Sequence, residues 1–215
     1  MAAKKARKPV SPRKRAAPAK DLPILPLGKQ SAWSRWLERH HAASPGIWLT
    51  FAKKGSGLTS LTYVEAVEAA LCWGWIDGQG RALDDERWLV KFTPRGARSV
   101  WSKINRERAT RLIESGAMRE PGLAEIDRAK RDGRWDAAYD SPRTAAVPAD
   151  LEAALAASAR AARCFATLDS ANRYAILWRL QTAKRPETRA RRLETFIGML
   201  ERGELLHPKR SKNEA

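Results

Sequence analysis

The sequence predicts an α+β protein, with a small antiparallel or mixed sheet packed by helices in its N-terminal half and an all-helical C-terminal half. Alternation of apolar and polar residues marks two strands, at 75–83 and 87–93. Apolar residues at helical spacing mark the neighbouring segments and, beyond about residue 144, nearly everything that follows. A chain of 215 residues is long enough for one large domain or two small ones.

Composition divides the chain into four segments. Residues 1–20 hold eight Lys or Arg, no acidic residue and little that is apolar, so we expect a disordered basic tail. We then expect an α+β domain at 21–143, a helical domain at 144–207 and a frayed end at 208–215. The formal net charge is +17, and the part after the tail is basic in its own right, which favours anionic partners.

In the first half, the sequence predicts a helix at 31–40 capped by Ser31 and a strand at 47–53. Thr62 and Glu65 have the spacing of a capping box, which predicts the start of the next helix. Gly74 is expected to end that helix.

The predicted hairpin follows, with an acidic turn at 84–86 and Trp88, Val90 and Phe92 on one face of its second strand. Pro94 is expected to stop this strand. Ser99 is then predicted to cap a helix at 100–115.

Further helices are predicted at 120–131, 149–163, 170–184 and 187–202. The last has apolar residues at i, i+3, i+4 and i+7, and Gly203 is expected to end it.

Several classes of protein are excluded by what the sequence lacks. Two cysteines and three histidines show no spacing for a disulfide framework or a zinc site, so we predict neither metal nor cofactor. No apolar run approaches the ~18 residues of a membrane span. There is no secretory signal pattern either, so we expect a cytoplasmic protein. No nucleophile–base–orienter set suggests itself, so no catalytic residue is predicted.

The sharpest local hypothesis is a pocket for an anionic ligand at the edge of the sheet. Indole faces suit flat rings and cations, and arginine binds phosphate or carboxylate in a bidentate manner. The candidate set comprises two tryptophan walls, four basic residues and two orienting polar residues: Trp75 and Trp101; Lys53, Lys54, Lys91 and Arg95; Asp77 and Asn105. In the competing interpretation the tryptophans are core residues, since each buries ~150–250 Å², and Asp77 anchors a turn.

Two other functions stay open. One is non-specific nucleic-acid binding, in which the tail would follow phosphates without reading sequence. Its candidate residues lie in the tail and near the start of the last helix: Arg13, Lys14, Arg15, Lys184, Arg185, Arg189 and Arg192. The other is an enzyme acting on a phosphorylated or acidic small molecule near Lys53, Asp77 and Arg95. The oligomeric state is not predicted.

Several motifs occur in one order along the chain: Gly46-Ile-Trp-Leu, Lys53-Lys, Thr62-Tyr-x-Glu-Ala, Gly74-Trp-Ile-Asp-Gly, Lys91-Phe-Thr-Pro-Arg, Trp101-Ser with Asn105, and Ala183-Lys-x-Pro-Glu-Thr-Arg with Arg192. In these motifs the chain resembles the YdeI/OmpD-associated family, often labelled bacteriocin-protection proteins, over about residues 25–207.

The resemblance implies a small α+β protein with a mixed N-terminal half and a helical C-terminal half. It also implies a link to stress and antimicrobial-peptide resistance, with no established enzymatic activity. The family is described as periplasmic, whereas this chain has no export signal and begins with a polybasic segment. We therefore expect a cytoplasmic binding protein for an anionic ligand or partner.

Overall fold

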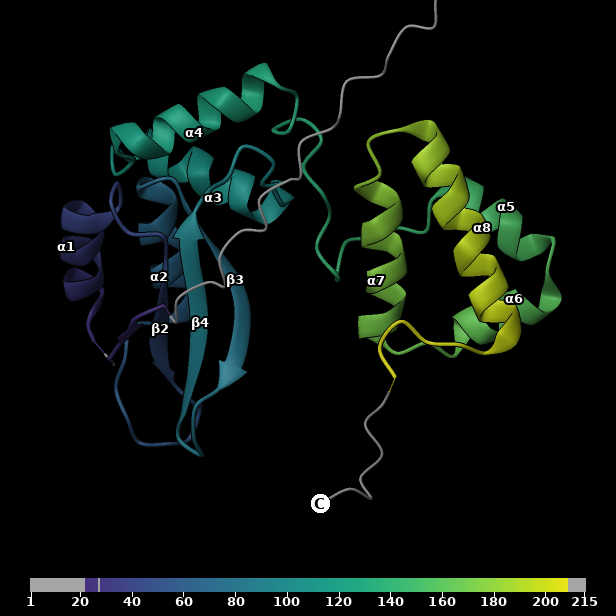
Figure 1. Cartoon of the computed structure of the whole chain (residues 1–215), viewed down its shortest axis with the longest axis horizontal. Helices are drawn as coiled ribbons and strands as arrows, with labels where there is room; N and C mark the ends of the chain where they lie inside the picture. Colours follow the sequence, from purple (N-terminus) through teal and green to yellow (C-terminus); the bar gives the residue numbers. More distant parts are fainter. Residues whose placement is uncertain (1–21, 27, 209–215) are drawn as a thin grey trace, which may run out of the picture.

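A four-stranded mixed sheet forms the centre of the N-terminal half (Figure 1). Its strands are β1 (Ile24–Leu25), β2 (Ile47–Ala52), β3 (Trp75–Ala82) and β4 (Arg87–Pro94), in the order β1-β2-β4-β3. β1 runs parallel to β2, and the other neighbours are antiparallel. The predicted α+β class and hairpin are thus confirmed, the hairpin strands to within one residue at each end.

The structure is a computed structural model, and it describes residues 22–26 and 28–208 of the chain. The predicted tail at 1–20 lies outside the described residues, as does the predicted frayed end except for Pro208.

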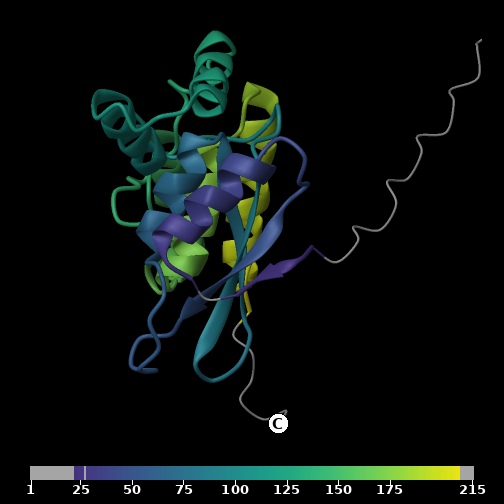
Figure 2. The ribbon, with the colours of Figure 1, turned by 90° about the vertical axis from the view of Figure 1, so that its left-hand side faces the viewer.

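One face of the sheet is buried under helices α1 (Gln30–His40) and α2 (Tyr63–Cys72), as Figures 1 and 2 show. Strand alternation decides which side chains face these helices. β2 contributes Ile47, Leu49 and Phe51, which pair in register with Phe92, Val90 and Trp88 of β4. The first apolar core consists of these strand residues, with Trp88 only partly buried against it, together with Trp33 and Leu37 of α1 and Ala66 and Val67 of α2.

The capping box at α2 is confirmed. The Thr62 hydroxyl accepts the Glu65 N–H at 3.2 Å, and the Glu65 carboxylate accepts the Thr62 N–H at 2.6 Å. The predicted cap of α1 is wrong, because that helix starts at Gln30 and the N-cap is Lys29, which makes no side-chain cap bond. Ser31 therefore lies inside the helix.

The start predicted for the next helix is also wrong. α3 spans Lys103–Glu114, and its N-cap is Ser102 rather than Ser99. The reason is a contact distant in sequence: Trp101 O accepts the Tyr139 N–H at 2.9 Å, and Lys103 N–H donates to Tyr139 O at 2.8 Å. Because Trp101 O accepts from Tyr139, it does not accept a helical N–H, and the helix begins after it.

Helix α4 (Glu120–Arg131) has the predicted bounds and packs on the end of α2. The approach is close at Gly122, where a Cβ atom would lie 2.5 Å from Cys72 O and 2.6 Å from Leu71 O. Any larger residue there would meet backbone, which cannot rotate away.

The C-terminal half is helical, as predicted. It comprises α5 (Ala149–Ala156), α6 (Ala159–Ala166), α7 (Ser170–Gln181) and α8 (Pro186–Arg202), gathered around a second apolar core (Figure 1).

The single helix predicted at 149–163 is wrong, since the chain breaks it into α5 and α6. Ser158 caps α6 by accepting the Ala161 N–H at 3.3 Å. The break allows Leu151 of α5 and Phe165 of α6 to enter one core.

Asp140 joins the two halves. Its carboxylate pairs with Lys103 Nζ at 2.6 Å and accepts the Gln181 amide at 2.7 Å. Its carbonyl accepts the Tyr174 hydroxyl at 2.8 Å, and the Tyr139 ring meets the Trp178 ring edge-on at 6.0 Å. These contacts join the two halves but do not define a boundary, so the domain limits at 143 and 144 stay predictions.

The contact at Gly122 predicts that Gly122→Ala lowers the free energy of unfolding by about 1–3 kcal/mol, because the methyl group forces α4 away from α2. Gly198→Ala is the matched control, also within a helix, where a Cβ would meet only the flexible end of Arg202 at 3.3 Å. The control should gain up to about 1 kcal/mol from helix propensity. Chemical denaturation measures both, and equal stabilities would contradict the close approach.

Candidate functional site

A groove of about 430 Å³ lies where β2 ends and α2 begins. The connecting loop forms one side, and its turns use Gly55 and Gly57, which have φ values of 87° and 74° that other residues rarely adopt. Two lysines and three aromatic rings line the groove together with small polar residues: Lys53, Lys54, Phe51, Tyr63, Trp88, Thr59, Ser60 and Thr62. The groove thus combines positive charge with flat apolar surface.

The rings of the groove are positioned by the sheet and by the capping box. Phe51 and Trp88 are cross-strand partners, with ring centroids 5.1 Å apart. Tyr63 is the first residue of α2, and its ring lies 6.1 Å from that of Trp88. Because Thr62 caps the helix, the position of Tyr63 follows from where α2 starts.

The two lysines differ in their surroundings. Lys53 donates from Nζ to Asp84 O at 2.6 Å, and its backbone N–H donates to Glu86 O at 2.7 Å, so it ties the loop to the hairpin turn. Lys54 is exposed and lines the groove beside it. An ammonium group keeps up to three donors, so both residues can also hold an anion.

Behind the groove, Tyr63 donates its hydroxyl to Asp77 Oδ2 at 2.5 Å. Burial raises the pKa of Tyr63 above its ordinary range, and the hydrogen bond and negative charge of Asp77 raise it further. The phenol therefore stays protonated at neutral pH and acts as a donor, with Asp77 as its acceptor.

Arg95 lies in the interior, with 4% of its surface exposed and its guanidinium 3.6 Å from the centre of the Trp101 ring. Burial lowers the pKa of Arg95 to about 10, and the negative charges of Asp77 and Glu125 partly offset that effect. The side chain is therefore still charged at neutral pH.

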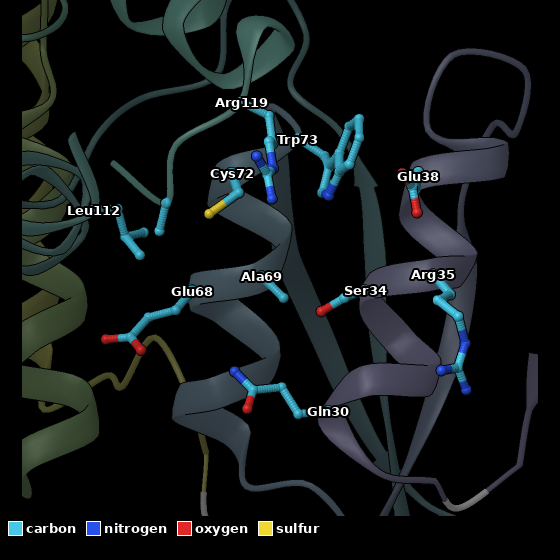
Figure 3. Close-up of a pocket in the computed structure, with 11 residues that line it drawn as sticks. Gln30, Ser34, Arg35, Glu38, Glu68, Ala69, Cys72, Trp73, Leu112 and Arg119 are labelled. Atoms are coloured by element: carbon cyan, nitrogen blue, oxygen red, sulfur yellow. The ribbon is translucent and has the colours of Figure 1, made fainter. Parts of the chain in front are cut away.

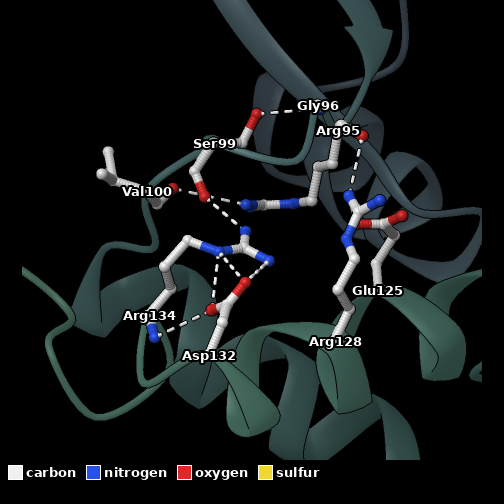
Figure 4. A network of polar contacts seen from close by, with 8 residues as sticks. All are labelled: Arg95, Gly96, Ser99, Val100, Glu125, Arg128, Asp132 and Arg134. Atoms are coloured by element: carbon white, nitrogen blue, oxygen red, sulfur yellow. Dashed lines mark hydrogen bonds and ion pairs between the residues drawn. The ribbon is translucent and has the colours of Figure 1, made fainter.

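Three arginines hold the loop between β4 and α3 through its carbonyls (Figure 4). Arg95 Nη1 donates to Val100 O at 3.4 Å, Arg134 Nη1 to Ser99 O at 2.8 Å, and Arg128 Nη2 to Arg95 O at 3.2 Å. Arg134 also pairs with Asp132 at 2.8 Å. These guanidinium groups stabilise the backbone that leads into α3.

The eight candidate residues fall into five places. Lys53 and Lys54 line the groove. Asp77 lies on β3 behind the groove, where it accepts from the Tyr63 hydroxyl. Arg95, Trp101 and Asn105 lie in the loop between β4 and α3 and in the first turn of that helix, where Asn105 accepts from Arg108 Nη1 at 3.1 Å. Lys91 lies on the opposite face of the sheet, in register with Trp48. Trp75 is 1% exposed and donates to His41 O from the core. A pocket formed by all eight stays a prediction.

Tyr63 and Trp88 line the groove but are absent from the sequence-predicted set. Signals for both were present: the capping box puts Tyr63 at the start of a helix, next to the Lys53–Lys54 loop, and alternation puts Trp88 on the helix-covered face. Their proximity depends on the pairing of β2 with β4, which sequence alone leaves undecided.

The arginines predicted near the last helix have structural partners. Arg189 binds both carboxylate oxygens of Asp150, at 2.7 and 2.8 Å, and donates to Leu180 O at 2.7 Å. Arg192 donates to Arg179 O. Both side chains thus satisfy carbonyls at the C-terminal end of α7.

The other nucleic-acid candidates are placed differently. Lys184 and Arg185 are exposed in the connection between α7 and α8. Arg13, Lys14 and Arg15 lie outside the described residues. Nucleic-acid binding by this set stays a prediction.

A second cavity, of about 310 Å³, lies between α1, α2 and the segment from α3 to α4 (Figure 3). No sequence-predicted site residue lines it. Its formal charges cancel, because its lining carries Arg35 and Arg119 with Glu38 and Glu68. Burial raises the pKa of the Cys72 thiol that also lines it, which disfavours a reactive thiolate.

Among residues 22–26 and 28–208, no group of three or more His, Cys, Asp or Glu side chains is arranged to hold a metal ion. Within the same residues, no helix has the length and apolar character needed to cross a membrane.

Two family models match separate parts of the chain. Residues 25–125 match a domain of unknown function (DUF8412), and residues 144–203 match the family described as bacteriocin-protection, YdeI or OmpD-associated. No curated protein and no solved structure matches the chain. The resemblance to this family, expected over about residues 25–207, is thus confirmed for residues 144–203, and the description of the family that matches residues 25–125 names no function.

The raised pKa values of the tyrosines predict an alkaline limit to stability. The chain has three, and burial is the main cause that raises the pKa of each: Tyr63, Tyr139 and Tyr174, the last to about 12. Their contribution to stability is present below the unfolded pKa, near ~10, and is lost as pH rises through the folded values. We expect little phenolate absorbance from the native protein at pH 10 and a falling free energy of unfolding above it. A full phenolate step near pH 10 would contradict this, and Tyr63→Phe should remove one step at higher pH.

The contacts of Arg189 predict that Arg189→Ala lowers the free energy of unfolding by about 1–3 kcal/mol, because Asp150 and Leu180 O lose their donors. Arg185→Ala, which removes an exposed arginine four residues earlier, should change it by less than about 0.5 kcal/mol. Urea denaturation of both variants measures the difference, and a silent Arg189→Ala would refute the structural role.

Proposed function

We propose that this chain, which carries a YdeI/OmpD-associated domain in residues 144–203, is a binding protein for an anionic ligand that bears a flat ring. The observation that carries the proposal is the groove itself, in which Lys53 and Lys54 lie beside the rings of Tyr63 and Trp88.

The chemistry of the groove favours such a ligand over a plain anion or a plain ring. Ammonium groups attract phosphate or carboxylate as point charges. Indole and phenol rings offer faces on which a flat ligand can stack. The Lys53 contact with Asp84 O and the Tyr63 contact with Asp77 hold these side chains in place before binding, which lowers the entropy cost of association.

Binding is a better-supported function than catalysis in this groove. Tyr63 keeps its proton because its pKa is raised, so the phenol does not serve as a base at neutral pH. The enzyme alternative, acting on a phosphorylated or acidic small molecule, would use the same lysines. It would need Asp77 to exchange its bond with Tyr63 for one with substrate.

The proposed biological role is resistance to bacteriocins or related stress, exercised in the cytoplasm. The description of the family at residues 144–203 supports the first part. Both cysteines, Cys72 and Cys164, are free thiols, which is compatible with a reducing compartment and supports the second part.

The test uses two ring-bearing anions, AMP and 1-naphthoate, with adenosine and inorganic phosphate as partial probes, in calorimetric titrations of the full chain. We expect a ring-bearing anion to bind more tightly than either partial probe. Lys54→Ala should weaken binding by about tenfold or more, since a charge-assisted hydrogen bond is lost. Trp88→Leu should weaken it as well, while Trp88→Phe keeps a ring and most of the affinity.

Arg160→Ala is the control, because it removes one exposed positive charge from α6 in the C-terminal half, outside the groove. Its affinity for both anions should equal that of the wild type. If neither ring-bearing anion binds, or if Lys54→Ala and Arg160→Ala behave alike, the proposal is wrong.

A further inference from the structure

The second face of the sheet is the feature that neither the groove nor the helices explain. Alternation turns Trp48 and Thr50 of β2, Leu89 and Lys91 of β4, and Arg81 of β3 to this side. In Figures 1 and 2, α1 and α2 lie against the other face, and no helix of the described residues packs on this one. Thr50 and Leu89 are themselves buried, so the part of this face that is available to a partner is formed by Trp48, Arg81 and Lys91.

The charge of this face is positive. Arg81 and Lys91 take part in no ion pair among the described residues, and Arg87 pairs with Asp84 at the hairpin turn. Asp77 of the same sheet faces the other way, toward Tyr63. Two cations on this face that lack an ion pair among the described residues favour an anionic partner.

The face also holds a flat stacking surface. The Arg81 guanidinium lies over the Trp48 ring, 4.2 Å from its centroid, so that a planar cation covers a planar ring. Arg81 is exposed, and its outer side is accessible. Nucleic-acid bases stack on aromatic rings and on arginine planes in this manner.

Phosphate contacts follow from the register. Lys91 is the direct cross-strand partner of Trp48, and Arg81 is the partner of Leu89, two residues from Lys91 along β4. Neighbouring strands are about 4.8 Å apart, so the ammonium group lies within one nucleotide of the stacked pair. A base on Arg81 and Trp48 can thus keep its phosphate near Lys91.

We propose that this face binds single-stranded nucleic acid, with bases stacked on the Trp48–Arg81 pair and a phosphate held by Lys91. Single strands fit better than duplexes, because a duplex keeps its base faces inside its own stack. The basic residues 1–20 would add affinity without sequence specificity. The proposal is independent of the groove, which lies on the opposite side of the sheet.

The test is fluorescence anisotropy of a labelled 20-nucleotide oligo-dT, titrated with the full chain at several salt concentrations. Trp48→Leu should weaken binding by about tenfold or more through lost stacking, and Trp48→Phe should restore most of it. Arg81→Ala should also weaken binding. Lys91→Ala should reduce the slope of log affinity against log salt by about 0.7, the value for one phosphate contact on a single strand.

Arg160→Ala serves as the control here, because it removes one exposed positive charge from α6 in the C-terminal half, outside both proposed binding surfaces. Circular dichroism and thermal melts check that each variant is folded. Selective losses at Trp48, Arg81 and Lys91, with Arg160→Ala near wild type, would support the proposal. It would be overturned if oligo-dT fails to bind at low salt, if a duplex of equal length binds as tightly, or if the sheet variants bind like the wild type.

Discussion

The antiparallel pairing of β2 with β4 is the constraint on which both the groove and the opposite face of the sheet depend. It puts Phe51 beside Trp88 under the helices and Trp48 beside Lys91 on the other side. A slip of one residue would exchange these faces, expose Phe92 and bury Lys91. The apolar core therefore determines which basic and aromatic residues remain outside.

Arginine has two separate roles in this chain. Arg95 and Arg134 are buried and donate to carbonyls of the loop before α3, and Arg189 does the same at the end of α7. Burying such charges costs desolvation energy, which hydrogen bonds offset only in part at Arg95, because its Nε and Nη2 have no hydrogen-bond partner among the described residues. The net charge of +17 thus overstates the positive surface available to ligands. The cations that remain free for a partner are fewer than this charge implies, and they include Lys54 in the groove and Arg81 on the sheet.

Local signals predicted the fold better than the site. The capping box at Thr62, the alternation at 87–93 and the stop at Gly203 need only near neighbours, and each is confirmed. The predicted start of α3 was wrong because Ser99 and Ser102 are equally good N-caps by residue type. The hydrogen bond from the Tyr139 N–H to Trp101 O, which sequence does not show, decides between them. The candidate site had a similar weakness, since tryptophan content alone does not separate the buried Trp75 from the half-buried Trp88.

By itself, the sequence determined the α+β class, the order of most elements, the family of the C-terminal helices and the excess of positive charge. These properties depend on composition, on periodicity and on motifs of a few residues. Only the tertiary structure decided that Lys54 lies near Trp88, that Arg81 covers Trp48, and that Arg95 and Arg189 are occupied by backbone carbonyls. The physical reason is that strand pairing and helix packing join residues tens of positions apart, and these contacts leave no periodic signal in the chain.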